Sequence, residues 1–189
     1  MKLRLLLPLT VATVCTIGLG AVACGDDDEK TDTGDGGGTA GAALSAEAYL
    51  EEVNGIQDGV TDAADAVGAR SEQSFGDPPR ARAALTAAVD VGESAVSSLE
   101  AVDPPADAEE IHTELIAAGE ALVTAVQSYS DRLTGVEAGA EFDEITEEAE
   151  GPESDLSQAI ERMGDACRAV QTYADDNNVE VDLSCPEAP

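Results

Sequence analysis

Aromatic residues are scarce in this chain. There is no tryptophan, and two phenylalanines and three tyrosines bring the aromatic share of the 189 residues to 3%. Pockets for small ligands are usually lined by bulky apolar and aromatic side chains with a few converging polar groups. The apolar residues here are mostly Ala, Val and Leu, which favour close contact between helices over an open cavity. The shortage of aromatics therefore counts against a ligand-binding receptor.

The chain contains a single histidine, His112. Glu109-Glu110-Ile111-His112 contains the E-x-x-H spacing, which puts a carboxylate and an imidazole on one helix face. Bundle proteins with paired metal ions use that motif twice, and this chain lacks the second histidine. Because His112 follows Ile111, a residue of the apolar stripe, we expect the imidazole to point toward solvent. One imidazole falls short of the usual ligand sets, so we predict no metal site.

Catalytic motifs are missing as well. A single histidine gives little support to a Ser-His-Asp triad or a Cys-His dyad. The chain also has no nucleophile elbow, zincin helix, P-loop or haem-attachment sequence. Paired carboxylates can hydrolyse glycosides. With 40 acidic residues, however, some pair lies at any chosen distance. We therefore predict no enzyme activity, no catalytic residue and no cofactor, with a hydrolase using carboxylates alone as the weakest alternative.

Positive charge is the third shortage, because 9 Lys and Arg face 40 Asp and Glu for a net charge of −31. Such an excess repels nucleic acid and anionic lipid head groups, which excludes a nucleic-acid partner. We interpret the acidity as a solvated coat on the protein surface. Low-affinity buffering of divalent cations is the alternative.

The N-terminal residues have the pattern of an export signal. Lys2 and Arg4 form a positive region, residues 5–19 form an uncharged apolar region, and Ala21-Val22-Ala23 supplies the small residues of a cleavage site. The stretch from Leu19 to Cys24 resembles the lipobox of bacterial lipoprotein precursors. It departs from that motif in having Ala three positions before the cysteine, where Leu is most frequent.

The resemblance implies that Cys24 is diacylated, that the chain is cut after Ala23, and that the new N-terminus is acylated. Two or three acyl chains give stable anchoring. The mature protein would then sit on the extracytoplasmic face of a bacterial cell membrane. Two alternatives are an uncleaved transmembrane helix and release by an ordinary signal peptidase. Pro8 and the glycines of the apolar run oppose the first, and the position of Cys24 opposes the second.

Composition divides the rest of the chain in two. Residues 24–44 carry the lipidated cysteine and a Gly- and Asp-rich stretch without large apolar residues, which we predict to be a disordered acidic tether. Residues 45–189 form the predicted helical domain. Removing residues 1–23, the signal peptide, takes away two of the nine basic residues and none of the 40 acidic ones, leaving a net charge of −33.

From Ser45 onward, apolar residues recur at steps of three and four, which is typical of amphipathic helices. We expect Ser45 to cap the first helix, and Asp107 and Glu110 to form a capping box for the third. Gly135 is expected to stop that third helix. The apolar stripes are Tyr49–Val67, Leu85–Val102, Ile111–Leu133 and Phe142–Ala174.

Proline and glycine separate the stripes, at residues 76–79, at Pro104-Pro105 and at Gly151-Pro152. The last break predicts a short helix followed by a long one. Asn177-Asn178 is expected to supply a left-handed cap before a short extended tail. Short connections and the lack of credible strand pairs predict an all-α fold, an antiparallel four-helix bundle whose last unit is split. Coiled-coil seams to partner chains are the alternative, and the breaks favour self-packing.

Tyr49, Tyr129 and Tyr173 each fall on or beside a stripe. We interpret them as core residues whose hydroxyls reach the rim. A shared binding patch would need all three to meet at one end of the domain.

Four cysteines divide into two groups. Cys15 would leave with the signal and Cys24 would be lipidated, so that Cys167 and Cys185 remain. In an exported protein an even remainder predicts a disulfide, and the tail is long enough to return to Cys167. A redox pair usually needs C-x-x-C spacing and nearby positive charge, so we favour a structural disulfide that tethers the tail.

The plan of the whole chain is similar to that of small helical extracytoplasmic lipoproteins of bacteria, although only the lipobox is specific. We therefore expect a lipid-anchored helical-bundle protein with an interaction or structural role at the cell envelope. Its contacts would be the membrane, through the lipid on Cys24, and an envelope protein; the oligomeric state is left open. The alternative is a ligand- or metal-binding lipoprotein that serves a transporter or sensor.

Overall fold

A computed structural model describes residues 43–71 and 76–186, and within these ranges the chain is all α, with five helices and no strand. The predicted signal peptide, the cleavage site after Ala23 and the lipidation site Cys24 lie outside the described residues and stay predictions. None of the described helices combines the length and apolar character that crossing a bilayer requires. The helices are α1 (Ala46–Ser71), α2 (Pro78–Glu100), α3 (Glu109–Arg132), α4 (Ala140–Ala149) and α5 (Asp155–Asp176).

Three of the helices begin with a side-chain cap. Ser45 before α1, Asp77 before α2 and Ser154 before α5 each accept a hydrogen bond from the backbone N–H three residues later, at 3.2, 3.2 and 3.0 Å. These bonds satisfy N–H groups that have no partner within the helix. The cap predicted at Ser45 is confirmed.

The capping box predicted for α3 does not form. Ala108 takes the N-cap position and offers no side-chain hydrogen bond. Asp107 lies one residue too early, and its carboxylate accepts a 2.9 Å hydrogen bond from the Tyr173 hydroxyl instead. Asp107 therefore bonds to Tyr173 of α5 and does not cap the N-terminus of α3.

Turns end the helices where the sequence indicates. Gly135, three residues beyond the end of α3, has φ +79°, and Asn178 beyond α5 has φ 55°. Both angles lie in the left-handed region that Gly and Asn adopt most readily. The split at Gly151-Pro152 is confirmed, because α4 ends at Ala149 and α5 begins at Asp155.

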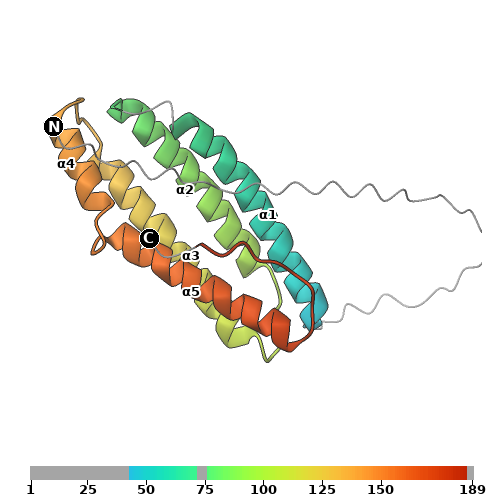
Figure 1. Ribbon diagram of the computed structural model, residues 1–189. Helices are drawn as coiled ribbons and strands as arrows, with labels where there is room; N and C mark the ends of the chain where they lie inside the picture. Colours follow the sequence, from blue (N-terminus) through green and yellow to red (C-terminus); the bar gives the residue numbers. More distant parts are fainter. Residues whose placement is uncertain (1–42, 72–75, 187–189) are drawn as a thin grey trace, which may run out of the picture. The chain divides into compact units, whose positions relative to one another are not determined.

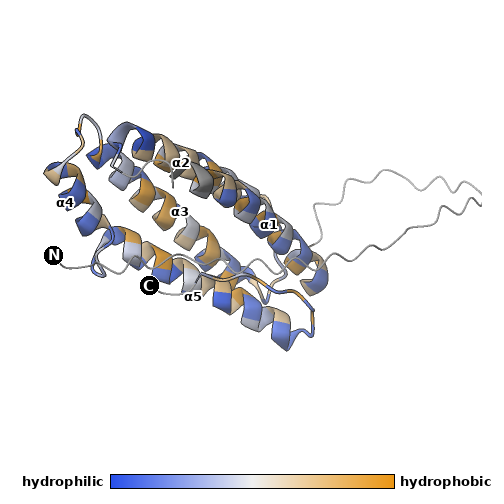
Figure 2. Cartoon of the chain, turned by 45° about the horizontal axis from the view of Figure 1, so that its top comes forward, coloured by the Kyte–Doolittle hydropathy of each residue, from blue (hydrophilic) through white to orange (hydrophobic). Residues whose placement is uncertain are grey.

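The long helices lie in the order α1, α2, α3, α5, and neighbours in this order run in opposite directions (Figure 1). Each packs along the next, whereas α1 meets α5 at only a few positions. Apolar residues face inward on these helices and polar residues face outward (Figure 2). The four helices therefore form an array that is tightly packed on one side and open between α1 and α5.

The hydrophobic core sits at one end of this array, which we call the closed end. It gathers residues from the start of α1, the end of α2, the start of α3, the end of α5 and the tail. Tyr49, Leu50 and Val170 are its largest fully buried side chains. Leu44, assigned from sequence to the end of the tether, also packs against it.

Glycines let α2 and α3 approach closely. A Cβ at Gly92 would stand 2.6 Å from Cγ2 of Val123, and one at Gly119 would stand 2.9 Å from Cγ2 of Val96. Each helix thus places a valine over a glycine of the other, so the expected close contact between helices is present here.

Candidate functional site

An apolar cavity of about 610 Å³ opens among α1, α2, α3, α5 and the C-terminal tail. Its volume falls within the range of ligand-binding pockets. The close helix contact expected from the sequence holds between α2 and α3 but not between α1 and α5. The shortage of aromatic residues therefore did not prevent a cavity, because its walls are built from aliphatic side chains.

Among the described residues, the wall carries no charged side chain, in a chain with 40 acidic residues. Its polar side chains are Gln57 and Thr61 on α1 and Ser184 in the tail; Cys167 also contributes, through its disulfide. The remaining wall is aliphatic or glycine, apart from Pro186 and the thioether of Met163. These described residues match an apolar ligand, and none of them offers an opposite charge to a buried charged group.

Stripe residues that the sequence places in a core line this cavity and are only partly buried. They come from all four long helices, as Val60 of α1, Val96 of α2, Leu122 of α3 and Ile160 of α5 show. Burying apolar surface stabilises a protein by about 25 cal/mol per Å², and this free energy is not gained where the side chains stay in contact with water. A ligand that covers this area would recover that free energy.

The tail forms one wall of the cavity through Leu183, Ser184 and Pro186. The predicted disulfide between Cys167 and Cys185 is confirmed, with a Cα–Cα distance of 5.5 Å. It anchors the tail to α5 beside these three residues.

Side chains of α5 hold the tail at further points. The Gln171 amide donates from Nε2 to the Val181 carbonyl at 3.0 Å, and its Oε1 accepts from the Leu183 N–H at 2.9 Å. At Gly164 the tail comes so close that a Cβ would stand 2.7 Å from the Pro186 carbonyl oxygen. We call residues 179–186 the strap. The sequence indicated its disulfide, but not the role of Gln171 or Gly164.

His112 is buried, with 5% of its surface exposed, so the sequence-based expectation that it points to solvent is wrong. The reason is that α3 packs against both α2 and α5. A helix between two neighbours buries a wider face than a single stripe, and that face includes the position after Ile111. Glu109 is exposed, so the E-x-x-H spacing brings no carboxylate to the imidazole.

The imidazole has two polar partners. Its Nδ1 lies 3.3 Å from the Tyr49 hydroxyl, and the ring also hydrogen-bonds the Leu99 carbonyl. Because a carbonyl only accepts, the ring N–H points to Leu99, and Nδ1 accepts from Tyr49. Burial lowers the pKa of His112, against a smaller opposing effect of the Leu99 hydrogen bond. The ring is therefore neutral near pH 7.

Tyr173 completes this cluster at the closed end. Its ring packs edge-on against Tyr49 at a centroid distance of 6.1 Å, and its hydroxyl donates to Asp107. Burial, and to a lesser extent the neighbouring Tyr173, raises the pKa of Tyr49 to about 12. Burial is also the largest cause for Tyr173, whose pKa is raised to about 12 with a further contribution from its hydrogen bond to Asp107.

Tyr129 lies elsewhere, donating to Thr146 of α4 at 3.2 Å. The three tyrosines therefore share no patch. Among residues 43–71 and 76–186, no group of three or more His, Cys, Asp and Glu side chains is placed to hold a metal ion. The polar cluster of Tyr49, His112, Tyr173 and Asp107 closes one end of the core and does not open into the cavity wall.

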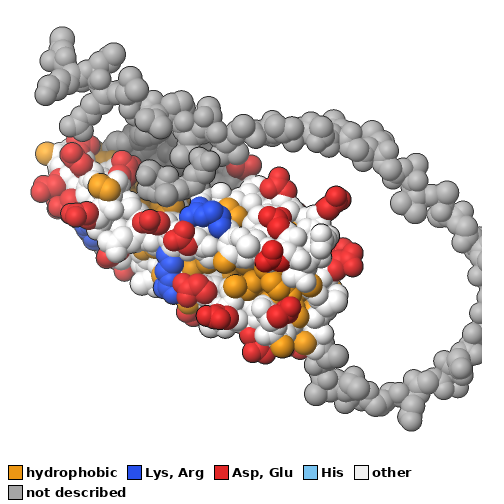
Figure 3. Space-filling model, turned by 60° about the horizontal axis from the view of Figure 1, so that its bottom comes forward, with side chains coloured by type: hydrophobic (Ala, Val, Ile, Leu, Met, Phe, Trp, Pro, Cys, Tyr) orange, Lys and Arg blue, Asp and Glu red, His pale blue; other side chains and the backbone are white. Residues whose placement is uncertain are grey.

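The surface around these elements is acidic. Acidic side chains are spread over the face in Figure 3, with hydrophobic side chains gathered between them and few basic ones. Arg162 of α5 donates to Glu114 of α3 at 2.8 Å, a hydrogen bond that lowers the pKa of the glutamate. Both groups are exposed, so this pair adds little to stability.

No protein family, curated protein or solved structure matches this chain.

Proposed function

We propose that the mature protein is a lipid-anchored extracytoplasmic protein that binds a small apolar molecule without chemically changing it. The observation that carries the proposal is the cavity of about 610 Å³, in whose wall none of the described residues carries a charged side chain. Of the two functions that the sequence left open, this one is the ligand-binding alternative. A purely structural protein would gain stability by closing α1 onto α5, whereas here aliphatic side chains stay partly uncovered.

The helices, the strap and the tether would have different roles in such a protein. We infer that α1, α2, α3 and α5 act as an antiparallel four-helix bundle opened along the α1–α5 side, with α4 as a short addition. The closed end keeps the helices together, and the strap forms a fixed wall. The tether would hold this domain above the membrane to which Cys24 is attached.

Binding of an uncharged fluorescent probe, N-phenyl-1-naphthylamine, tests the proposal. The chain from residue 25 to residue 189 suits the experiment, because all the core and cavity residues named above lie between Leu44 and Pro186. It needs no detergent, which would compete for the cavity. We expect saturable binding of about one probe per chain, with an affinity that does not fall when salt is added.

A pair of variants locates the probe. Ala95→Phe places a ring in the cavity from the α2 wall, whereas Ala83→Phe adds the same ring at an exposed position of α2 outside the lining. We expect Ala95→Phe to weaken binding at least tenfold and Ala83→Phe to leave it unchanged. Absence of saturable binding to the folded wild-type chain would contradict the proposed function.

A further inference from the structure

We propose that the cavity holds one long aliphatic chain of a monoacyl lipid whose head group carries no negative charge. This inference rests on the proposed ligand-binding function and names the class of ligand. Three observations support it, namely the length of the cavity, its aliphatic lining and the charge around it.

The cavity is long. Its lining extends from Val53 to Gly68 on α1 and from Leu156 to Val170 on α5, a rise of about 21–23 Å at 1.5 Å per residue. Its volume of about 610 Å³ is spread along that length. The space therefore follows the helix axes as a channel.

One alkyl chain fits such a channel. Carbon atoms in contact lie about 4 Å apart, which gives an extended alkyl chain a cross-section of about 15–20 Å². A chain of this cross-section over about 21 Å occupies about 320–420 Å³, which the cavity of about 610 Å³ accommodates. An extended chain advances about 1.2 Å per single bond, by the geometry that sets the reach of a polypeptide. A channel of this length thus takes about 16–18 carbons.

Polar groups of the wall lie where the cavity meets solvent. Gln57 is half-buried, while Thr61 and Ser184 are exposed. The Thr61 hydroxyl donates to the Gln57 carbonyl at 3.0 Å, which leaves its lone pairs as acceptors. These amide and hydroxyl groups suit the hydroxyls or esters of a neutral head group.

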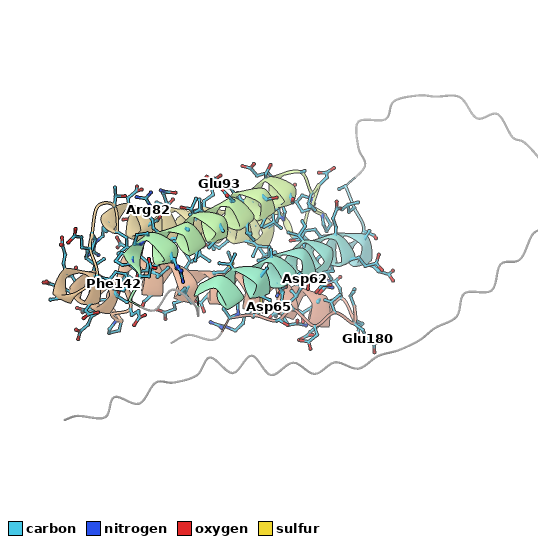
Figure 4. The ribbon with its side chains drawn as sticks, turned by 90° about the horizontal axis from the view of Figure 1, so that it is seen from above. Asp62, Asp65, Arg82, Glu93, Phe142 and Glu180 are labelled. Carbon is cyan, nitrogen blue, oxygen red and sulfur yellow. A yellow bond between two sulfur atoms is a disulfide. The ribbon has the colours of Figure 1, made fainter. Side chains whose placement is uncertain are left out.

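Acidic residues flank that rim on both sides. Asp58, Asp62 and Asp65 are exposed on α1, and Glu180 and Asp182 are exposed in the strap. Figure 4 marks Asp62 and Asp65 along α1 and Glu180 beyond the end of α5. None of the described lining residues is basic, and the nearby Arg168 is held by Asp165 and the Pro186 carbonyl. A carboxylate or phosphate head group at the rim would therefore meet mainly like charge.

Displacement of the bound probe by ligands with matched chains tests the inference on the chain from residue 25 onward. Saturated 1-monoacylglycerols of 8, 10, 12, 14, 16 and 18 carbons, each kept below its aggregation concentration, make the first series. Each added methylene should tighten binding about fourfold, up to about 16 carbons, beyond which the affinity should level off. A diacylglycerol should bind at least tenfold more weakly than the monoacylglycerol of the same chain length.

The second series varies the head group at 12 carbons. In low salt we expect the fatty acid to bind at least tenfold more weakly than the monoacylglycerol, and the alkyltrimethylammonium ion to bind at least as well. Added salt should narrow these differences, because exposed charges are screened. Gln57→Leu with Thr61→Val should weaken monoacylglycerol binding, whereas Ala83→Phe, outside the lining, should leave it unchanged.

The outcomes separate the two proposals. Probe binding that is blocked by Ala95→Phe, yet shows no dependence on chain length, would overturn the aliphatic ligand and leave the proposed function standing. Equal affinity for the fatty acid and the monoacylglycerol in low salt would also overturn it. A dimer that dissociates when probe is added, seen by analytical ultracentrifugation, would assign the groove to a second copy of the chain. No probe binding at all would overturn both proposals.

Discussion

The hydroxyl of Tyr49, at the start of α1, donates to Nδ1 of His112 in α3 inside the closed end of the core. This contact joins helices that are neighbours neither in sequence nor in the packing order. It depends on a neutral imidazole, because a protonated ring has no lone pair to accept the bond. The closed end therefore carries a pH-sensitive group in its interior.

Acid should weaken the fold through His112. Its pKa is lowered in the folded state, so the unfolded chain binds more protons as the pH falls below about 6.5. The contribution of His112 is thus present above that pH and is lost as the pH falls through the folded-state pKa. Urea unfolding at pH 7.5 and 5.0, compared between wild type and His112→Gln, measures it. We expect the loss on acidification to be larger in wild type, and equal losses would contradict the prediction.

A methyl group at Gly92 should destabilise the contact between α2 and α3. Gly92→Ala would force the stiff Val123 side chain to move, and we expect a loss of about 1–3 kcal/mol in the free energy of unfolding. Gly59→Ala in α1 is the matched control. No atom lies within 4 Å of its new Cβ, so the gain in helix propensity of about 0.5–1 kcal/mol should appear. Val123→Ala should restore much of the stability lost in Gly92→Ala; destabilisation of the same size at both glycines would argue against the packing described.

The strap should depend on both its disulfide and Gln171. The bridge closes a segment with a sequence separation of 18, so Cys167→Ala with Cys185→Ala should cost about 3 kcal/mol in urea unfolding. Gln171→Leu removes two hydrogen bonds to the strap, each worth about 1 kcal/mol. In that variant the amide of Leu183 should exchange its hydrogen faster, whereas the amide of Val170 should not change. Unaltered exchange at Leu183 would show that Gln171 does not hold the strap.

Lipidation is expected at Cys24. Growth with a clickable palmitate should label the wild-type protein and leave Cys24→Ala unlabelled, because the resemblance to the lipobox assigns the acyl chains to that sulfur. Cys15→Ala is the matched control and should keep the label. If the wild-type protein also lacked label, the predicted anchor would be excluded.

Local signals in the sequence predicted much of the fold. Ser45 caps α1, the Gly151-Pro152 break separates α4 from α5, and Asn178 reverses the chain so that Cys185 returns to Cys167. Each of these features depends on residues close in sequence or on a pairing forced by counting cysteines. The apolar stripes also marked the faces that turn inward.

Features set by the packing of several helices could not be predicted in the same way. His112 is buried because α3 has neighbours on two sides, and a single stripe does not report the width of a buried face. The cavity depends on the separation of α1 from α5, which neither Val60 nor Ile160 encodes alone. Asp107 was assigned to a cap because its partner Tyr173 lies 66 positions away in the sequence.

The most direct measurement of the central claim is methyl NMR of the isotope-labelled chain during titration with the sixteen-carbon monoacylglycerol. Methyl resonances of cavity residues, such as Val60, Leu122 and Ile160, should shift and saturate together. Those of Leu50 and Val102, in the closed end and outside the cavity lining, should stay in place. Shifts confined to surface methyls, or no shifts while the chain stays folded, would contradict the claim that the cavity is the binding site.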